Sequence, residues 1–426
     1  MTDPREAEVL RAFERYERYI HPSFARLIRL AGLETLAVEA DGAVVRDIYG
    51  REYLDFAAGI AVFVLGHRHP AVVAAVEREL HRLPLSPRVP LDGLAGELAE
   101  LLAQVTPGDL QYTFFCHSGT EANEGALKLA RLATGRPGFV AAEGAFHGKT
   151  FGSLSVSGRD VFRDPFRPLL PEVRHVPFGD LAALEAAVDD TTAAVILEPI
   201  QGENGIVVPP DGYLRGARAA CDRHGALLIL DEVQTGMGHT GRLWACEWEG
   251  VTPDILTAAK GLGGGVAPLG AFIARPRAFD ALARHPNPVL HSTTIMNRLA
   301  WAAAIATIRT IQAEGLLERA LAIGERLLGG LREVQHRHPR LIREVRGRGA
   351  LVGVEFVHSD VGLLVNMGLV ERQVLGVFAL NRQEVIRFAP PLIVTDAQVD
   401  RAVEAMGEAC AAAEGLLGEV LEGAAS

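Results

Sequence analysis

The middle of the chain, from about residue 95 to about residue 295, alternates between segments of helical periodicity and short apolar runs. The apolar runs are Tyr112–Cys116, Phe139–Ala142, Ala193–Leu197, Ala226–Leu230 and Ile255–Ala258. Short apolar runs between helical segments are typical of βαβ units, in which buried parallel strands alternate with helices. The pattern predicts an α/β fold with a mostly parallel central sheet.

The two ends of the chain have a different pattern. Residues 1–35 are helical in periodicity, and Ala43–Tyr53 alternates like a hairpin that turns at Tyr49-Gly50-Arg51. Further helix or strand patterns cover Asn297–His336, Gly349–Phe356, Val385–Phe388 and the segment from about Asp396. We expect residues 1–60 and 298–426 to form one smaller α+β domain beside a large domain of residues 61–297.

Each apolar run ends in a polar turn. The turns contain Ser118-Gly119-Thr120, Phe146-His147-Gly148, Glu198-Pro199, Asp231-Glu232-Val233-Gln234 and Lys260. In open parallel sheets, ligands bind beyond the carboxyl ends of the strands. We therefore expect these five turns to converge on one site.

Composition and charge narrow the class of protein. Of the 426 residues, 49% are hydrophobic and 22% are charged, which is ordinary for a globular protein. A formal net charge of −11 argues against nucleic-acid or anionic-membrane partners. The four cysteines are not paired in motifs, and the N-terminus does not resemble a signal peptide, so we expect a cytoplasmic protein. Among the histidines, His67, His69 and His147 form no convincing metal motif.

Lysine is almost absent from this chain. Lysine occurs only at Lys128, Lys149 and Lys260, while the other positive residues are arginines, which cannot act as amine nucleophiles. Lys128 lies inside a helical pattern and is readily explained by packing. Lys260 follows an apolar strand and precedes a glycine run, where desolvation would make its amine nucleophilic. A P-loop has the opposite order, with its lysine after the glycines.

Two further features are ambiguous by themselves. Asp231 ends a very apolar strand, where a carboxylate is costly without a partner. That partner is either a protonated pyridine nitrogen or a structural group such as a salt bridge or helix cap. Ser118-Gly119-Thr120 precedes a helical stretch from Glu121 to Leu132, so it is either a phosphate-binding turn or a plain capping box.

Taken together and in order, the motifs resemble a known family. The segments FFCHSGTEANEGALKLAR, GAFHGKT, EPIQGENG, LDEVQTGMG and the Lys260 segment are similar to those of class III (ω-) aminotransferases of pyridoxal 5′-phosphate (PLP) fold type I. The likeness extends from about residue 11 to about residue 412 and is closest to putrescine aminotransferases.

This resemblance implies a PLP enzyme that moves the terminal amino group of a diamine or ω-amino acid to a keto acid such as 2-oxoglutarate. It also implies a homodimer with active sites at the subunit interface. A PLP-dependent racemase, epimerase or aminomutase of the same fold is the alternative, and a non-catalytic binding protein of this fold is a second one.

The resemblance also implies roles for individual residues. Lys260 would hold the cofactor as a Schiff base and shuttle a proton, and Asp231 would pair with the pyridine nitrogen. Glu203 and Arg387 resemble a pair in which the glutamate masks or releases an arginine that binds substrate carboxylates; a structural ion pair is the alternative for Arg387. Lys149 is either a carboxylate contact or a structural charge. The remaining cofactor-binding residues implied are Ser118, Gly119 and Thr120 for the phosphate, Phe146 and Val233 for the ring faces, Gln234 near the phenolic oxygen, and His147.

The family pattern is broken at residues 291–298. There the threonine that reaches the partner subunit's cofactor phosphate aligns with Thr294, with Thr293 as its rival. Arg298 replaces a proline, and His117, Asn204 and His239 are further departures. These changes predict an altered loop and an altered substrate fit, with the core cofactor set intact.

Overall fold

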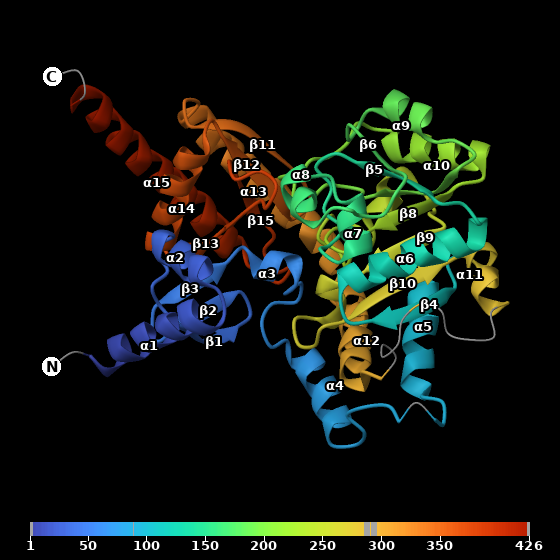
Figure 1. Cartoon of the computed structure of the whole chain (residues 1–426). Helices are drawn as coiled ribbons and strands as arrows, with labels where there is room; N and C mark the ends of the chain where they lie inside the picture. The colour runs from blue at the N-terminus through green and yellow to red at the C-terminus, as the bar shows by residue number, and fades with distance from the viewer. Residues whose placement is uncertain (1–2, 88, 285–289, 291–295, 424–426) are drawn as a thin grey trace.

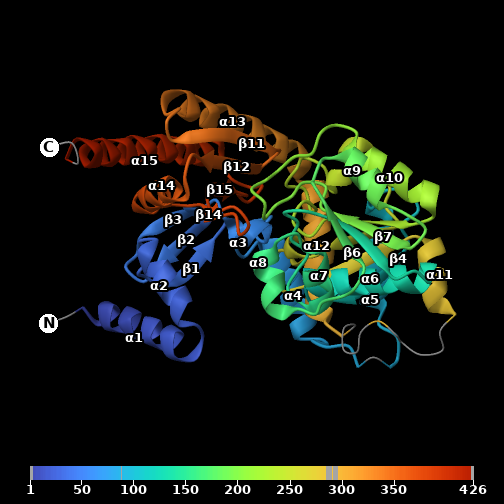
Figure 2. The ribbon, with the colours of Figure 1, turned by 45° about the horizontal axis from the view of Figure 1, so that its top comes forward.

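The computed structural model describes residues 3–87, 89–284, 290 and 296–423 of the chain. Its larger lobe is built on a seven-stranded sheet in the order β4-β10-β9-β8-β7-β5-β6 (Figures 1 and 2). The strands are β4 (Tyr112–Cys116), β5 (Gly138–Ala142), β6 (Val173–Val176), β7 (Thr192–Leu197), β8 (Leu227–Asp231), β9 (Ile255–Ala258) and β10 (Gly270–Ala274).

The five predicted strands are confirmed, and so is the mostly parallel sheet. Strands β6, β5, β7, β8 and β9 pair in parallel. β10 is antiparallel to both β9 and β4, so β4 runs in the same direction as the parallel set. The sequence analysis did not identify β6 or β10. Because only β10 is reversed, the carboxyl ends of the other six strands meet at one edge.

Helices cover both faces of this sheet. α6 packs across one face with α11 beside it, and α5 and α10 pack on the other face. Successive strand residues alternate between two apolar clusters, with Ile196 and Ile229 on the α6 side and Val195 and Leu228 on the other. The helices of this lobe are α4 (Pro70–Leu80), α5 (Gly93–Val105), α6 (Gly119–Thr134), α7 (Phe151–Val156), α8 (Asp160–Arg163), α9 (Leu181–Ala187), α10 (Tyr213–His224) and α11 (Pro276–Ala283), with the 3₁₀ helices η1 (Asp164–Phe166), η2 (Ala245–Glu249) and η3 (Lys260–Gly263).

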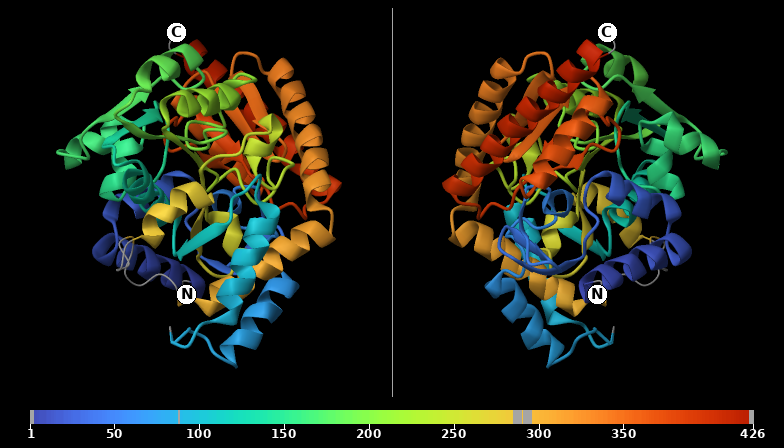
Figure 3. Two further views of the ribbon diagram at one scale, coloured as in Figure 1. Left: turned by 90° about the vertical axis from the view of Figure 1, so that its right-hand side faces the viewer. Right: turned by 90° about the vertical axis from the view of Figure 1, so that its left-hand side faces the viewer.

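The smaller lobe is built from both ends of the chain. Its first sheet has the order β1-β2-β3-β13 and its second the order β11-β12-β15-β14. In the first sheet the C-terminal β13 pairs in parallel with the N-terminal β3, which joins the two ends. The right-hand view of Figure 3 shows the blue N-terminal and the red C-terminal segments together on this side of the molecule. The strands are β1 (Ala37–Asp41), β2 (Val44–Asp47), β3 (Glu52–Asp55), β11 (Ile342–Arg348), β12 (Leu351–Phe356), β13 (Val374–Leu375), β14 (Val377–Phe378) and β15 (Val385–Phe388). The helices are α1 (Pro4–Tyr19), α2 (Pro22–Leu30), α3 (Ala58–Ala61), α13 (Leu316–Arg337), α14 (Ser359–Glu371) and α15 (Asp396–Gly423).

Local details follow from the sequence. The predicted hairpin is formed by β2 and β3, and Gly50 adopts φ +83° in its turn, a value that glycine tolerates best. The predicted helical stretch of residues 297–336 is two helices, because Gly315 at φ +62° separates α12 (Arg298–Ala313) from α13. α12 packs against α4, α5 and η3 of the larger lobe, although we predicted that residue 298 begins the C-terminal part of the small domain. Within the described residues, no helix is long and apolar enough to span a bilayer.

Candidate active site

A cavity of about 300 Å³ lies where the strand ends meet. It is bounded by the N-terminus of α6 and by the turns that follow β5, β7, β8 and β9. The convergence predicted from the polar turns is therefore observed. The lining residues are Gly119, Thr120, Asn123, Phe146, His147, Gly148, Lys149, Glu198, Glu203, Asp231, Val233, Gln234 and Lys260.

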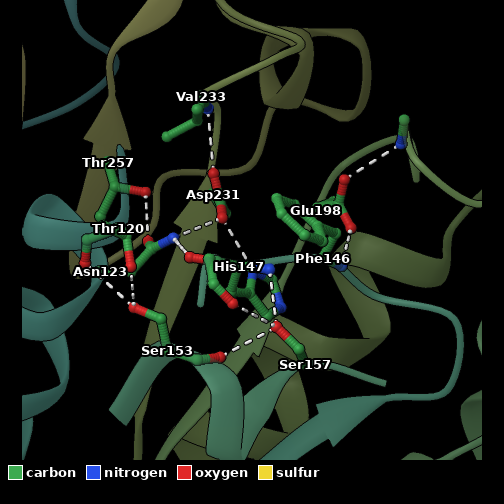
Figure 4. A network of polar contacts seen from close by, with 12 residues as sticks. Thr120, Asn123, Phe146, His147, Ser153, Ser157, Glu198, Asp231, Val233 and Thr257 are labelled. Carbon is green, nitrogen blue, oxygen red and sulfur yellow. Dashed lines mark hydrogen bonds and ion pairs between the residues drawn. The ribbon is translucent and has the colours of Figure 1, made fainter. Parts of the chain in front are cut away.

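Asp231, at the end of β8, is the centre of a hydrogen-bond network (Figure 4). Its Oδ2 accepts from His147 Nδ1 at 2.7 Å and from Asn123 Nδ2 at 2.7 Å, while its Oδ1 accepts from the Val233 N–H at 3.0 Å. The carboxylate is 3% exposed, so these donors offset the cost of burying its charge. With only one donor among the described residues, Oδ1 keeps room for a further one.

Asn123 holds this network to the helix. Its Nδ2 also donates to the His147 carbonyl at 2.8 Å, and its Oδ1 accepts from Thr257 Oγ1 of β9 at 2.8 Å. Asn123 lies one turn after Gly119 in α6, so these two residues are on the same face of the helix. The sequence analysis missed Asn123, because a buried amide inside a helix has no local signal.

Lys260 lies shortly after the end of β9 and lines the cavity. Its backbone adopts φ +42°, a sparsely populated conformation for a residue with a side chain. Burial lowers the pKa of its amine, and Arg387 acts in the same direction, whereas Glu203, Glu198 and Asp231 partly oppose the shift. A lowered pKa makes the unprotonated, nucleophilic amine more accessible near neutral pH.

The turn at the start of α6 caps the helix and also lines the cavity. Ser118 caps the helix, because its Oγ accepts from the Glu121 N–H at 3.3 Å, and it does not line the cavity. Gly119 and Thr120 do line it. A Cβ added at Gly119 would lie 2.7 Å from Val233 Cγ1, so only glycine lets these two turns approach. The helix N-terminus thus presents its backbone to the cavity, an arrangement that suits an anion.

Gln234 and Gly202 are in close contact at another wall. A Cβ on Gly202 would lie 1.4 Å from Gln234 Oε1, so any side chain there would displace the Gln234 amide. Gln234 Oε1 and His147 Nε2 are buried polar atoms without a partner within the described structure. Buried polar atoms are normally paired, which suggests that a bound group completes this wall.

Glu203 and Arg387 form a buried ion pair between the two lobes. Arg387 on β15 donates through Nη1 to Glu203 Oε1 at 3.0 Å, and its Nη2 lies 2.9 Å from Glu203 Oε2. Burial alone would raise the pKa of Glu203, but Arg387 and Lys260 outweigh it and hold the pKa below its usual value. Glu203 lines the cavity, whereas Arg387 lies behind it.

The small lobe supports this pair through its backbone. The Leu380 N–H donates to Glu203 Oε2 at 3.1 Å, and Arg387 Nη2 donates to the Phe378 carbonyl at 3.1 Å. The Asn381 N–H donates to the Glu203 carbonyl at 2.9 Å. The ion pair is therefore bidentate and also anchored at both ends.

Glu198 is a third carboxylate in the cavity wall, and no role was predicted for it from the sequence. It directly follows the apolar strand β7, the same signal that drew attention to Asp231. Burial raises the pKa of Glu198 to about 7; His147 partly opposes this rise, whereas the like charge of Asp231 adds to it. Its oxygens accept from the backbone N–H groups of Phe146 and Gly202.

The remaining predicted residues are placed as follows. Lys149 is an exposed residue of the cavity lining, with its Nζ 4.9 Å from the centre of the Phe162 ring. Thr294 and Thr293 lie outside the described residues. His67 pairs with Asp55 at 2.8 Å, and across the described chain no group of three or more His, Cys, Asp or Glu side chains could hold a metal ion.

The cavity residues fit pyridoxal phosphate. Asp231 Oδ1 can take a ring N–H, the α6 N-terminus can take a phosphate, and Lys260 offers an amine for an aldehyde. Phe146 and Val233 are apolar lining side chains of the kind that cover ring faces, and the unpartnered Gln234 oxygen suits a ring hydroxyl. Fold and cavity together are those of a PLP-dependent transferase of fold type I.

Comparison with known proteins agrees with this assignment. The aminotransferase class-III family model matches residues 31–410, and the chain belongs to that family. Class-III aminotransferases use PLP, so the chain is a PLP-dependent transaminase.

The similar solved structures are also transaminases. An ornithine aminotransferase from Toxoplasma gondii ME49 is 33% identical with a TM-score of 0.85, over 92% of this chain and 96% of that one. An (S)-enantioselective ω-transaminase from Thermomicrobium roseum is 31% identical with a TM-score of 0.83, over 89% and 92%. A transaminase from the marine bacterium Virgibacillus is 29% identical with a TM-score of 0.83, over 90% and 94%.

Proposed function

We propose that this transaminase moves the terminal amino group of a diamine or ω-amino acid, with putrescine as the model donor, to a keto acid such as 2-oxoglutarate. The observation that carries the proposal is the buried Glu203–Arg387 pair beside Lys260. The pair supplies one carboxylate and one guanidinium. If the two groups separate, the guanidinium can bind a substrate carboxylate in place of Glu203. Similarity to an ornithine aminotransferase and an ω-transaminase supports a terminal amine as the reacting group.

The pair explains how one cavity could accept two unlike substrates. While Glu203 neutralises Arg387, the wall offers no free positive charge, which suits the uncharged or cationic chain of an amine donor. When Glu203 turns away, Arg387 is free to bind the carboxylate of a keto acid as a bidentate partner. Alternate binding at one site is what a two-stage amino transfer requires.

The chain's other residues have simpler tasks in this proposal. When bound, pyridoxal phosphate supplies an aldehyde that condenses with amines and a ring that accepts electrons. Lys260 Nζ holds the cofactor and then moves a proton at the substrate carbon, which its lowered pKa favours. Asp231 keeps a proton on the ring nitrogen, and His147 and Asn123 orient Asp231. Gly119 and Thr120 would bind the phosphate at the start of α6.

We also propose that the enzyme is a homodimer in which Thr294 of each subunit reaches the other subunit's cofactor phosphate. The alignment of Thr294 with the threonine that has this role in the family supports the assignment, within a segment that otherwise departs from the family pattern. Lys149 at the cavity rim is suited to steer a substrate carboxylate.

A donor screen on the purified protein tests the activity. Putrescine, ornithine and 4-aminobutyrate are each incubated with 2-oxoglutarate or pyruvate, and glutamate or alanine is measured. We expect glutamate from putrescine, and no product from the Lys260→Ala variant. The absence of product with every ω-amine, together with inversion of an amino acid's stereochemistry, would identify a racemase instead.

A further inference from the structure

Glu198 joins two loops that are far apart in the sequence. It is 5% exposed at the end of β7, and its Oε1 accepts from the Phe146 N–H at 2.9 Å. Its Oε2 accepts from the Gly202 N–H at 3.0 Å. Figure 4 shows the Glu198 side chain beside Phe146, on the opposite side of Asp231 from Thr120 and Asn123 of α6. One carboxylate therefore connects the loop after β5 to the loop after β7.

Each of these loops carries side chains that line the cavity. Phe146 lies on the first loop, and Glu203 directly follows Gly202 on the second. Gly202 is also in close contact with Gln234, since a Cβ there would lie 1.4 Å from Gln234 Oε1. Any shift of the Gly202 backbone must therefore move Gln234, Glu203 or both.

We propose that Glu198 is a positioning residue that sets the spacing of Phe146 from Gln234 and Glu203 across the cavity. The inference deepens the proposed function, because Phe146 and Gln234 are assigned there to the cofactor and Glu203 to substrate exchange. The contacts of Glu198 from which it is argued involve only residues of this chain.

The chemistry of the contact requires a carboxylate. An ionised carboxylate only accepts hydrogen bonds, so both oxygens can face backbone N–H groups. Glutamine would keep the shape but would turn an NH₂ donor toward one of the two N–H groups, and one contact would be lost. Protonation of Glu198 has a similar effect, since one oxygen then carries a hydrogen.

The charge environment adds a pH dependence to this contact. The charged or titratable groups that act on Glu198 are His147 and Asp231, and Glu198 in turn acts on Lys260. Burial is the largest effect and raises the pKa of Glu198 to about 7. Both contacts are complete when Glu198 is ionised, so the two loops are held most firmly above about pH 7.

Glu232 offers a matched control. It is 1% exposed, and it too accepts two backbone N–H groups, from Ala245 at 3.0 Å and Cys246 at 2.8 Å, and in addition the Thr235 hydroxyl. It does not line the cavity. Glu232→Gln therefore removes an equally buried carboxylate without touching the Phe146 and Gly202 loops.

The test is amide hydrogen exchange on the full chain without cofactor. Peptides covering residues 145–149 and 199–204 are followed in wild type, Glu198→Gln and Glu232→Gln. We expect exchange in both peptides to be about 10-fold faster in Glu198→Gln. In Glu232→Gln, faster exchange should be confined to residues 232–236 and 244–248, which contain the hydrogen-bond partners of Glu232. Equal exchange in wild type and Glu198→Gln, or equal changes in the two variants, would overturn the proposal.

Two further measurements extend the test, and the first, on wild type alone, does not depend on how well a variant folds. In wild type, exchange in the two peptides, corrected for the intrinsic effect of pH, should slow as the pH rises through about 7. The Kd for pyridoxal phosphate should rise about 10-fold in Glu198→Gln and less than about 2-fold in Glu232→Gln. A flat pH dependence in wild type would contradict the proposal. If the donor screen fails but hydrogen exchange gives the results expected above, the proposed function is rejected and the positioning role of Glu198 stands.

Discussion

Two buried polar pairs, Asp231–His147 and Glu203–Arg387, lie at the cavity that Lys260 lines, and they are built in different ways. The Asp231–His147 pair belongs to one lobe, where β8, α6 and the loop after β5 all contribute to it. The Glu203–Arg387 pair spans both lobes, with its arginine on β15 and its backbone partners at residues 378–381.

The difference shows how one cavity can combine a carboxylate with a fixed partner, Asp231, and an arginine whose partner can be exchanged, Arg387. Asp231 is fixed by donors from a single rigid lobe, which suits a partner that never changes. Glu203 and Arg387 satisfy each other; Glu203 also accepts from the Leu380 N–H across the lobe boundary, and Arg387 donates to the Phe378 carbonyl of its own lobe. Because the pair spans two lobes, a movement of one lobe relative to the other or a rotation of Glu203 would separate it. This arrangement suits a partner that alternates between two substrates.

The largest expected effect comes from breaking the fixed pair. Asp231→Asn keeps the size of the side chain but cannot hold a proton on the ring nitrogen. We expect kcat to fall about 10³-fold in both half-reactions, because the electron-accepting property of the ring is lost in each. Single-turnover kinetics with donor and acceptor separately measure this. A loss confined to one half-reaction would show that Asp231 serves a substrate and not the cofactor.

Breaking the exchangeable pair should have a smaller and one-sided effect. For Arg387→Met we expect kcat/KM for 2-oxoglutarate to fall about 100-fold, because its carboxylate loses a bidentate partner. The amine half-reaction should change less than about 3-fold. Glu203, left buried and unpaired, should lower the stability of this variant by about 3 kcal/mol. The double variant Glu203→Gln/Arg387→Met restores stability in thermal unfolding if this explanation is right, while keto-acid affinity stays low.

The smallest effect is a pH dependence of stability. The pKa of Glu203 is lowered in the folded chain, so its contribution to stability is complete above its ordinary pKa of 4.5. This contribution is lost as the pH falls through the folded-state value. The difference in unfolding free energy between wild type and Glu203→Gln should therefore be constant from pH 6 to about pH 5 and shrink below. Urea unfolding between about pH 3 and pH 6 measures it, and a difference that grows toward acid would contradict the sign.

Much of the fold and site could be predicted because the relevant signals are local. The apolar runs located the strands, and the polar residues after them located the cavity. β10 (GAFIA) is as apolar as the predicted strands, but its reversed direction has no signal of its own in the sequence. Asn123 and the contacts of Glu198 were missed because their partners are distant in the chain, and only tertiary packing brings them together. Ser118 proved to be the helix cap rather than a lining residue.

The pairing of β3 with β13 has a consequence for how the chain acquires its structure during synthesis. Leu54 pairs with Val374, 320 positions later, so the first sheet of the small lobe cannot close until most of the chain has left the ribosome. The strands of the larger sheet lie between these two points and can assemble earlier. Arg387 emerges later still, so Glu203 stays without its arginine partner until translation is almost finished.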